Sequence, residues 1–395
     1  MTLKKNFLYA FTFLMLIIIL TSCISTKNTH EDLPDNPYYS ITVKRTFSAD
    51  AAIYSTPVIT GNGNVIIGSH DKNVYFFSAD GACIKTYRTD GWIHATPSVL
   101  SNGWIALGSY DKHIYFFDEQ GNLKHKIKPG GSIFTNAVEI MEGIIVFGTN
   151  LKNIVFHNLF SGEQKEIKTK KLVHGSPAVL SGGRIIAGSN DKRIYIADNN
   201  GKLIQKIKTR GWIMHSQPVE LHNGSIAVGS YDKRLYILSG SGEIRHIFKT
   251  DGPIHSSPKE TEKNTIVFGS LDKNIYFIRP DGTLVKKFQT GGKVFSSSAF
   301  LQNGDVVIGS FDGKIYILSP EGSFLSSFAA DGAIFSSPVV LENDTIVCAT
   351  VKGTIYFLQV SRNPIPINTP CRCHTQESLP VPEPLNSNLP AASDI

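Results

Sequence analysis

The chain has 395 residues, of which 18% are charged, and its formal net charge is +6. Lys4 and Lys5 precede a long apolar run and account for two of these charges, so the rest of the chain carries about +4. No block of five or more like charges occurs, and this excludes a nucleic-acid-binding tail of the usual kind. We therefore expect no nucleic-acid partner.

The N-terminal segment has the pattern of an export signal. Its uncharged apolar run extends from Phe7 to Leu20, and a helix of that length reaches about 21 Å, short of the roughly 30 Å of bilayer hydrocarbon. The run ends in Leu20-Thr21-Ser22-Cys23, which resembles a bacterial lipobox. We predict that residues 1–22 are a lipoprotein signal peptide and that Cys23 becomes the acylated first residue. The alternative, an ordinary secretory signal with an incidental cysteine, also predicts export.

Residues 23–40 are polar and contain prolines, so we expect a lipidated N-terminus followed by a flexible tether. The remaining cysteines do not indicate a disulfide framework. Cys83 and Cys348 fall in different kinds of predicted strand, and the other two lie near the C-terminus.

A repeat of about 40 residues dominates the rest of the chain. Its clearest segment reads Gly-Ser-His-Asp-Lys-Asn-Val-Tyr at residues 68–75. The same pattern begins again at Gly108, Gly188, Gly229, Gly269 and Gly309, and degenerate copies begin at Gly148 and Ala349. The sequence therefore contains eight units.

Each unit predicts four short strands, which we name A to D. Strand A has a pattern such as Ile254 to Pro258, an Asn-Gly hairpin leads to strand B, and B ends at the repeated glycine. An Asp-Lys or Asp-Gly turn leads to strand C, and a second glycine-containing turn leads to D. Four strands in about 40 residues are typical of a propeller blade, so residues 41–360 are predicted to form an all-β, eight-bladed propeller of four-stranded antiparallel blades.

The eighth unit stops after its C strand, near Thr354 to Leu358. The other D strands place an aromatic residue or isoleucine nineteen positions after the repeated glycine, and stepping 40 residues back from Tyr87 reaches Phe47. We predict that Ile41 to Ser48 supplies the missing D strand and closes the ring. The C-terminal residues 361–395 are rich in proline and predicted to be disordered. Cys371, Cys373 and His374 in this tail have metal-ligand chemistry but number only three.

The repeat resembles the pyrroloquinoline-quinone-type, or quinoprotein-like, propeller repeat, over about residues 41–360. Together with the lipobox, it is similar to the BamB-like lipoproteins of the outer-membrane β-barrel assembly machine. The resemblance implies a propeller fold, which is compatible with more than one function. In six units lysine replaces the turn glycine, and Phe, Tyr or Ile replaces the tryptophan that docks blades in quinoprotein enzymes.

A quinone-dependent enzyme would need a calcium site, an indole stacked on the cofactor and usually vicinal cysteines, and none is evident in the sequence. We expect no cofactor, no metal site and no catalytic residues. Ser and His recur together in the A strands, as at His255 and Ser256, but neighbours on a strand face opposite sides, so we interpret them as repeat consensus.

One residue per innermost strand is expected near the central channel. An extra residue in the fifth unit suggests a β-bulge that puts His215 in place of Met214. His94, His174, His215 and His255 are then predicted to line the channel. Separate blades make convergence on a zinc ion difficult, so we expect satisfied channel histidines.

The face that carries the D-to-A and B-to-C loops is the candidate binding surface. Turn lysines recur there, and tryptophans and tyrosines lie on the same loops; Trp, Tyr and Arg are enriched at protein interfaces. The alternative is a solvated face, with packed tryptophans and with the lysines partly offset by neighbouring aspartates. The predicted partner-binding residues are Trp92, Trp212, Tyr110, Tyr231, Lys72, Lys112, Lys192, Lys233 and Lys273.

The leading function hypothesis is a monomeric, lipid-anchored propeller that binds protein partners outside the cytoplasm. The resemblance implies components of outer-membrane protein assembly as partners and an outer-membrane anchor, on the periplasmic or cell-surface side. The alternative is a quinoprotein-like enzyme or a propeller that binds a small ligand in its channel. A third hypothesis is a surface lipoprotein that binds host or carbohydrate ligands.

Overall fold

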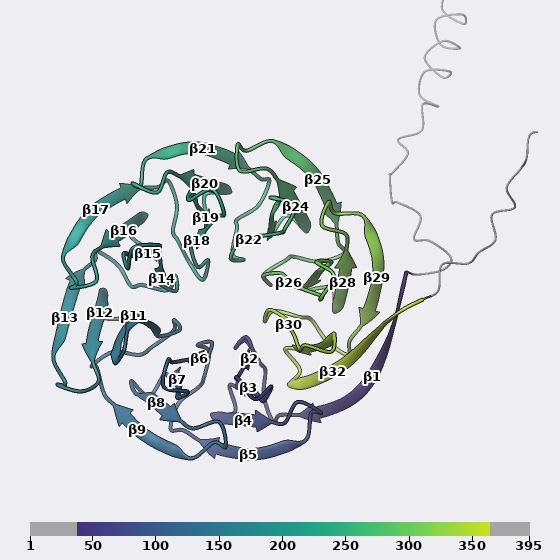
Figure 1. The fold of residues 1–395 in the computed structure, drawn as a ribbon, viewed down its shortest axis with the longest axis horizontal. Coiled ribbons are helices and arrows are strands. Elements are labelled where there is room, and N and C mark those ends of the chain that lie inside the picture. Colours follow the sequence, from purple (N-terminus) through teal and green to yellow (C-terminus); the bar gives the residue numbers. More distant parts are fainter. Residues whose placement is uncertain (1–37, 364–395) are drawn as a thin grey trace, which may run out of the picture. The chain divides into compact units, whose positions relative to one another are not determined.

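Across residues 38–363, thirty-two β-strands form eight separate four-stranded antiparallel sheets, arranged as blades around a central axis (Figure 1). A computed structural model describes residues 38–363. No helix occurs among these residues, and none of them therefore forms a helix long and apolar enough to cross a membrane. The predicted eight-bladed propeller is confirmed.

The strands follow the predicted order A to D from the axis outwards in every blade (Figure 1). Blades 1 to 4 comprise β2 (Val58–Ile59), β3 (Val65–Gly68), β4 (Asn73–Phe77) and β5 (Cys83–Arg88); β6 (Ser98–Val99), β7 (Ile105–Gly108), β8 (Ile114–Phe117) and β9 (Leu123–Ile127); β10 (Val138–Met141), β11 (Ile144–Thr149), β12 (Asn153–Asn158) and β13 (Gln164–Lys168); β14 (Ala178–Val179), β15 (Ile185–Ser189), β16 (Arg193–Ala197) and β17 (Leu203–Lys208).

Blades 5 to 7 repeat the same order, and blade 8 takes its outer strand from the N-terminal side of the chain. They comprise β18 (Val219–Glu220), β19 (Ile226–Ser230), β20 (Arg234–Leu238) and β21 (Ile244–Lys249); β22 (Lys259–Glu260), β23 (Ile266–Gly269), β24 (Asn274–Ile278) and β25 (Leu284–Gln289); β26 (Ala299–Phe300), β27 (Val306–Gly309), β28 (Lys314–Leu318) and β29 (Phe324–Ala329); β30 (Val339–Val340), β31 (Thr345–Ala349), β32 (Thr354–Arg362) and β1 (Tyr39–Ser48).

Ring closure follows the prediction and extends beyond it. Strand β1 pairs antiparallel with β32, from Tyr39 opposite Arg362 to Ser48 opposite Thr354. The predicted boundary at Ile41 was therefore too late, because Tyr39 is buried and its hydroxyl donates a hydrogen bond to Asp305 (2.5 Å) in blade 7. The predicted docking position, Phe47, packs edge-on against Tyr75 (5.0 Å) of blade 1. The signal peptide, Cys23, most of the tether and the tail from Pro364 lie outside the described residues.

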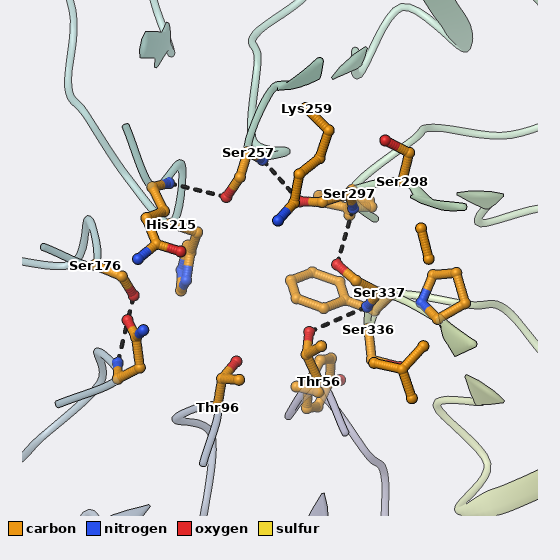
Figure 2. A pocket seen from close by; sticks show the side chains of 18 of the residues that line it. Thr56, Thr96, Ser176, His215, Ser257, Lys259, Ser297, Ser298, Ser336 and Ser337 are labelled. Atoms are coloured by element: carbon orange, nitrogen blue, oxygen red, sulfur yellow. Dashed lines mark hydrogen bonds between the residues drawn. The ribbon is translucent and has the colours of Figure 1, made fainter. Parts of the chain in front are cut away.

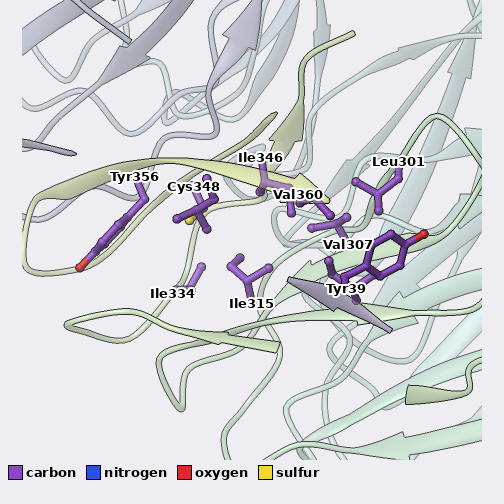
Figure 3. Close-up of a cluster of buried hydrophobic side chains, with 11 residues drawn as sticks. Tyr39, Leu301, Val307, Ile315, Ile334, Ile346, Cys348, Tyr356 and Val360 are labelled. Atoms are coloured by element: carbon purple, nitrogen blue, oxygen red, sulfur yellow. The ribbon is translucent and has the colours of Figure 1, made fainter. Parts of the chain in front are cut away.

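The core consists of eight apolar clusters, and each fills the space between two adjacent blades. Figure 3 shows the cluster that joins blades 7 and 8, where Val307 and Ile315 meet Ile346, with Tyr39 of the closing strand at its edge. Because the stabilising contacts lie between blades, each blade depends on both of its neighbours.

The innermost strands differ from the prediction. Segments such as Ile254 to Pro258 lie along the channel, and the ladder of blade 6 starts only at Lys259. The reason is that Ser256 occupies the ladder position: the Gly269 N–H donates to its Oγ (2.7 Å), and the hydroxyl donates to the Gly269 carbonyl (3.0 Å). Pro258 in addition has no N–H to contribute.

The turn lysines occupy a backbone conformation that normally favours glycine. All six have positive φ, with Lys112 at 74°, whereas blades 7 and 8 have Gly313 at 84° and Gly353 at 94°. A side chain in this conformation costs about 1 kcal/mol. At Gly353 there is also no space, because a Cβ would lie 2.5 Å from the Ala49 carbonyl oxygen.

These turns generate a paired prediction. Lys112→Gly should raise the free energy of unfolding by about 0.5–1 kcal/mol, because glycine adopts positive φ without strain but loses more chain entropy on folding. Gly353→Lys should lower it by about 2 kcal/mol or more, because its Cβ displaces the backbone at the ring closure. Urea denaturation of both variants measures the effect, and a loss of stability in Lys112→Gly would contradict the assignment.

Candidate functional site

The D-to-A and B-to-C loops lie together on one face of the propeller, which we call the loop face. The Tyr110 N–H in a B-to-C loop donates to the Trp92 carbonyl in a D-to-A loop (2.9 Å), and the His70 N–H donates to Ala52 in the same way (3.1 Å). The strand directions therefore place the loops that carry the predicted partner-binding residues on one face.

The turn lysines of this surface are free to contact a partner, whereas the aspartate beside Lys72 already accepts hydrogen bonds within the protein. Five of the six turn lysines are exposed, and Lys72 is half-buried; among residues 38–363 none of the six forms an ion pair. Asp71 instead accepts hydrogen bonds from the Tyr75 hydroxyl (2.6 Å) and the Asp50 N–H (3.1 Å). Asp71 therefore holds the D-to-A loop, the turn and strand C together, and it forms no ion pair with Lys72 in the described residues.

Both tryptophans are exposed to solvent. Trp92 is 51% exposed and Trp212 is 43% exposed. One face of Trp92 stacks on His70, with ring centroids 5.2 Å apart and planes 8° from parallel. The Trp92 indole is thus held against the loop face, and neither indole is buried in the core.

The two predicted tyrosines point inwards. The Tyr110 ring packs edge-on against Phe134 of the channel (4.6 Å), and Tyr231 lies 6.2 Å from His255. Burial raises the pKa of Tyr231 to about 12 and also raises that of Tyr110. Both tyrosines are only partly exposed and line the channel opening as much as the outer surface.

A pocket beside Trp212 was not predicted. It has a volume of about 300 Å³ and is lined by Trp212, Lys152, Lys170, Lys171, Leu172, Asn150 and Asn190. Lys170 and Lys171 stand where other repeats have Asp-Gly or Arg-Gly, as at Asp90-Gly91 and Arg210-Gly211. Comparing the repeats position by position could have identified this basic departure in advance.

The channel is closed at one level by a layer of rings. Tyr54, Phe134, Phe295 and Phe335 contribute to it, together with the four predicted histidines. His215 has a positive φ of 63° at the predicted irregularity and takes the place of Met214. Its ring lies 4.5 Å from that of His255, 5.2 Å from His94 and 5.6 Å from His174, so the four form one cluster across the channel.

Burial keeps these histidines neutral. Desolvation lowers the pKa of His94 to about 3, with repulsion from His70 adding to it, and lowers those of His174 and His255 to about 4. It also lowers the pKa of His215 well below its usual range. Within residues 38–363 no three His, Cys, Asp or Glu side chains are placed to hold a metal ion. Cys83 and Cys348 are free thiols, whereas Cys371, Cys373 and His374 lie outside the described residues.

Beneath the ring layer, hydroxyl groups connect successive blades (Figure 2). The Gln217 N–H donates to Ser257 Oγ (2.9 Å), Ser257 N–H to Ser297 (2.8 Å), and Ser297 N–H to Ser337 (2.9 Å). Ser337 N–H donates in turn to Thr56 (3.2 Å), and Asn136 N–H to Ser176 (3.4 Å). We call these five hydroxyl groups the hydroxyl girdle. The paired serines of the repeat therefore have structural partners: one bonds within its blade and the other bonds to the next blade.

Comparison with known proteins identifies the fold. No family model and no curated protein matches the sequence. Solved structures match it, among them the crystal structure of BamB from Moraxella catarrhalis, with a TM-score of 0.68 and 16% sequence identity. The match covers 81% of this chain and 100% of that chain. The expected BamB-like propeller fold is confirmed, and identity this low shows the fold alone.

The histidine cluster predicts an acid-sensitive propeller. An unfolded histidine takes up its proton near pH 6.5 and folded His255 near pH 4, so the unfolded state binds more protons between these values. Stability should therefore fall as the pH drops from 6.5 towards 4, by about 2 kcal/mol for this residue between pH 7 and pH 5. His255→Phe, which copies Phe295 and Phe335, should reduce that loss.

Thermal unfolding at pH 7 and pH 5 measures the difference. The control is His246→Phe, which replaces an exposed histidine on outer strand β21. An equal acid-induced loss in the parent protein and in His255→Phe would show that His255 does not carry the effect.

Proposed function

We propose that this chain is a membrane-anchored, extracytoplasmic propeller lipoprotein that acts as a protein-interaction scaffold, without catalytic activity or a cofactor of its own. Its loop face docks protein partners, and components of outer-membrane protein assembly are the partner class we favour. The observation that carries the proposal is the exposure of Trp92 and Trp212 on one face, among lysines without acidic partners in the described residues.

The physical basis is the contrast between these two residue types. An indole loses apolar surface to the partner and retains an N–H donor, so it contributes much of the energy of an interface. Rim lysines contribute mainly to the rate of association and to partner choice. The loop face combines both on rigid turns, and the pocket of Lys152, Lys170 and Trp212 offers a concave seat for a partner side chain.

The assignment to outer-membrane assembly is supported by the shared fold with BamB and by the lipobox-like sequence ending at Cys23. We propose an outer-membrane lipid anchor at Cys23, with the propeller on the periplasmic or cell-surface side, and a monomeric propeller. The proposal needs no chemistry in the channel.

The tryptophans should be the anchors of the interface. Trp92→Ala combined with Trp212→Ala should reduce partner capture at least tenfold, because about 1.4 kcal/mol lost between two hot-spot side chains already has that effect. In-cell crosslinking followed by quantification of the captured partner measures it. The control is Phe160→Ala, which removes an exposed ring from a C-to-D turn on the opposite face.

Charge reversal gives a different result if the lysines steer the encounter. Lys112→Glu with Lys233→Glu should weaken capture at low ionic strength and have little effect at high salt, because charges are screened over about 10 Å at 0.1 M salt.

If the double tryptophan variant unfolds at a lower temperature than the parent, the indoles are structural and the interface proposal is wrong.

Anchoring should depend on Cys23. Stable attachment needs more than one acyl chain, and a lipidated N-terminal cysteine supplies them. Cys23→Ala should release the protein into the soluble fraction, measured by fractionation in high salt. Membrane association equal to that of the parent would mean that another segment provides the attachment.

A further inference from the structure

The channel beneath the ring layer contains a cavity of about 520 Å³ with an unusual charge balance (Figure 2). Lys259 is the one formally charged side chain among its described lining residues, and no carboxylate lines it. The histidines at its closed end, His94, His215 and His255, are held neutral by burial, which lowers their pKa. The cavity therefore has one cation and no counter-ion of its own.

Lys259 is a departure from the repeat. At the same position the other blades have small or apolar residues, namely Val58, Ser98, Val138, Ala178, Val219, Ala299 and Val339. Its side chain is directed into the cavity (Figure 2) and forms no ion pair or hydrogen bond with any residue in 38–363. Lys259 reaches solvent through the open channel, and desolvation by the surrounding wall lowers the pKa of its ammonium group.

The hydroxyl girdle adds donors to the same cavity. Each of its oxygens accepts a backbone N–H from the adjacent blade, as Ser297 does from Ser257. The hydroxyl proton stays available, because none of these five groups donates a hydrogen bond within the described residues. A hydroxyl group both donates and accepts, so this wall offers mainly O–H groups to a ligand.

The wall next to Lys259 contains polar atoms without partners. Ser298 lines the cavity and is only 4% exposed, yet its Oγ has no hydrogen-bond partner in the described residues. On the blade 3 side of the cavity, away from Lys259, Asn136 Oδ1 also has no hydrogen-bond partner in the described residues. Ser298 is a second departure from the repeat, because the equivalent residue is proline in six of the other blades. A buried polar atom without a partner is destabilising and is expected where a ligand or water completes the site.

We propose that the channel cavity binds a small organic anion, whose carboxylate or phosphate group is held by the ammonium of Lys259 and by hydroxyl groups of the girdle. Carboxylate and phosphate oxygens are acceptors only, which matches a wall that supplies one cation and several O–H donors. A cavity of this size suits a single small molecule. This inference is independent of the loop face and does not rest on the proposed scaffold function.

The test uses the full-length protein in a non-ionic detergent and three probes, measured by isothermal titration calorimetry. Inorganic phosphate and glucuronate supply the two anionic groups, and glucose is the neutral control. We expect one anion per chain to bind and glucose not to bind. Binding of phosphate alone identifies a phosphate-bearing ligand, and binding of glucuronate alone identifies a carboxylate-bearing ligand. Binding of both anions means that the cavity selects its ligand by negative charge.

The decisive variant is Lys259→Val, because valine is the residue of four other blades at this position and should fold normally. It should lower anion affinity at least tenfold, while Lys259→Arg retains the charge and should bind within a few-fold of the parent. Lys44→Val, at an exposed lysine of outer strand β1, is the matched control.

A second measurement locates the site directly. Acetylation of lysines, followed by mass spectrometry, should show that the bound anion protects Lys259 and leaves Lys44 unprotected. Equal affinity in the parent and Lys259→Val, glucose binding as strong as anion binding, or no anion binding up to about 10 mM would each overturn the proposal.

Discussion

The contact between the repeated glycine of one blade and a branched side chain of the next blade determines the rest of the structure. A Cβ on Gly68 would lie 2.1 Å from Ile93 Cγ2, and one on Gly188 would lie 2.0 Å from Ile213 Cγ2. Ile93 and Ile213 are completely buried in these positions. The glycine thus leaves the space that a branched side chain of the neighbouring blade fills. Adding even one methyl group to a packed core typically costs about 1–3 kcal/mol. The constant spacing of the glycine along the sequence follows from this contact.

In an open row of blades, the first and the last blade would each expose one apolar face. Ring closure packs these two faces against each other. In the last blade Ala349 replaces the repeated glycine, and its cluster includes Ile53 from the first blade, while β1 completes the last sheet. Closure also covers the edge of β32 that would otherwise offer free backbone groups for pairing. Because all eight clusters lie between blades, the contacts that stabilise the ring are the same contacts that position the channel and the loop face.

A frame held in this way allows functional residues to differ between repeats. Most residues that face neighbouring blades follow the repeat, whereas two pairs of departures lie on surfaces that packing does not constrain. Lys170 and Lys171 change the loop face beside Trp212. Lys259 and Ser298 change the channel wall of adjacent blades 6 and 7. In a repeat protein, a position that breaks the pattern on an open surface is therefore more informative about binding than one that follows it.

The sequence by itself determined the period, the four strands of each unit, the blade number and the strand that closes the ring, because these depend on local alternation and turn chemistry repeated eight times. It also identified His215 as the channel residue, since one extra residue shifts the register of a strand. Only the tertiary structure decided that Trp92 is exposed while Tyr110 points inwards. It also decided that Asp71 accepts a hydrogen bond from Tyr75 and that no carboxylate lines the channel cavity beside Lys259. These features depend on which side chains from different blades converge, and convergence is set by the closed ring, which spacing along one chain does not describe.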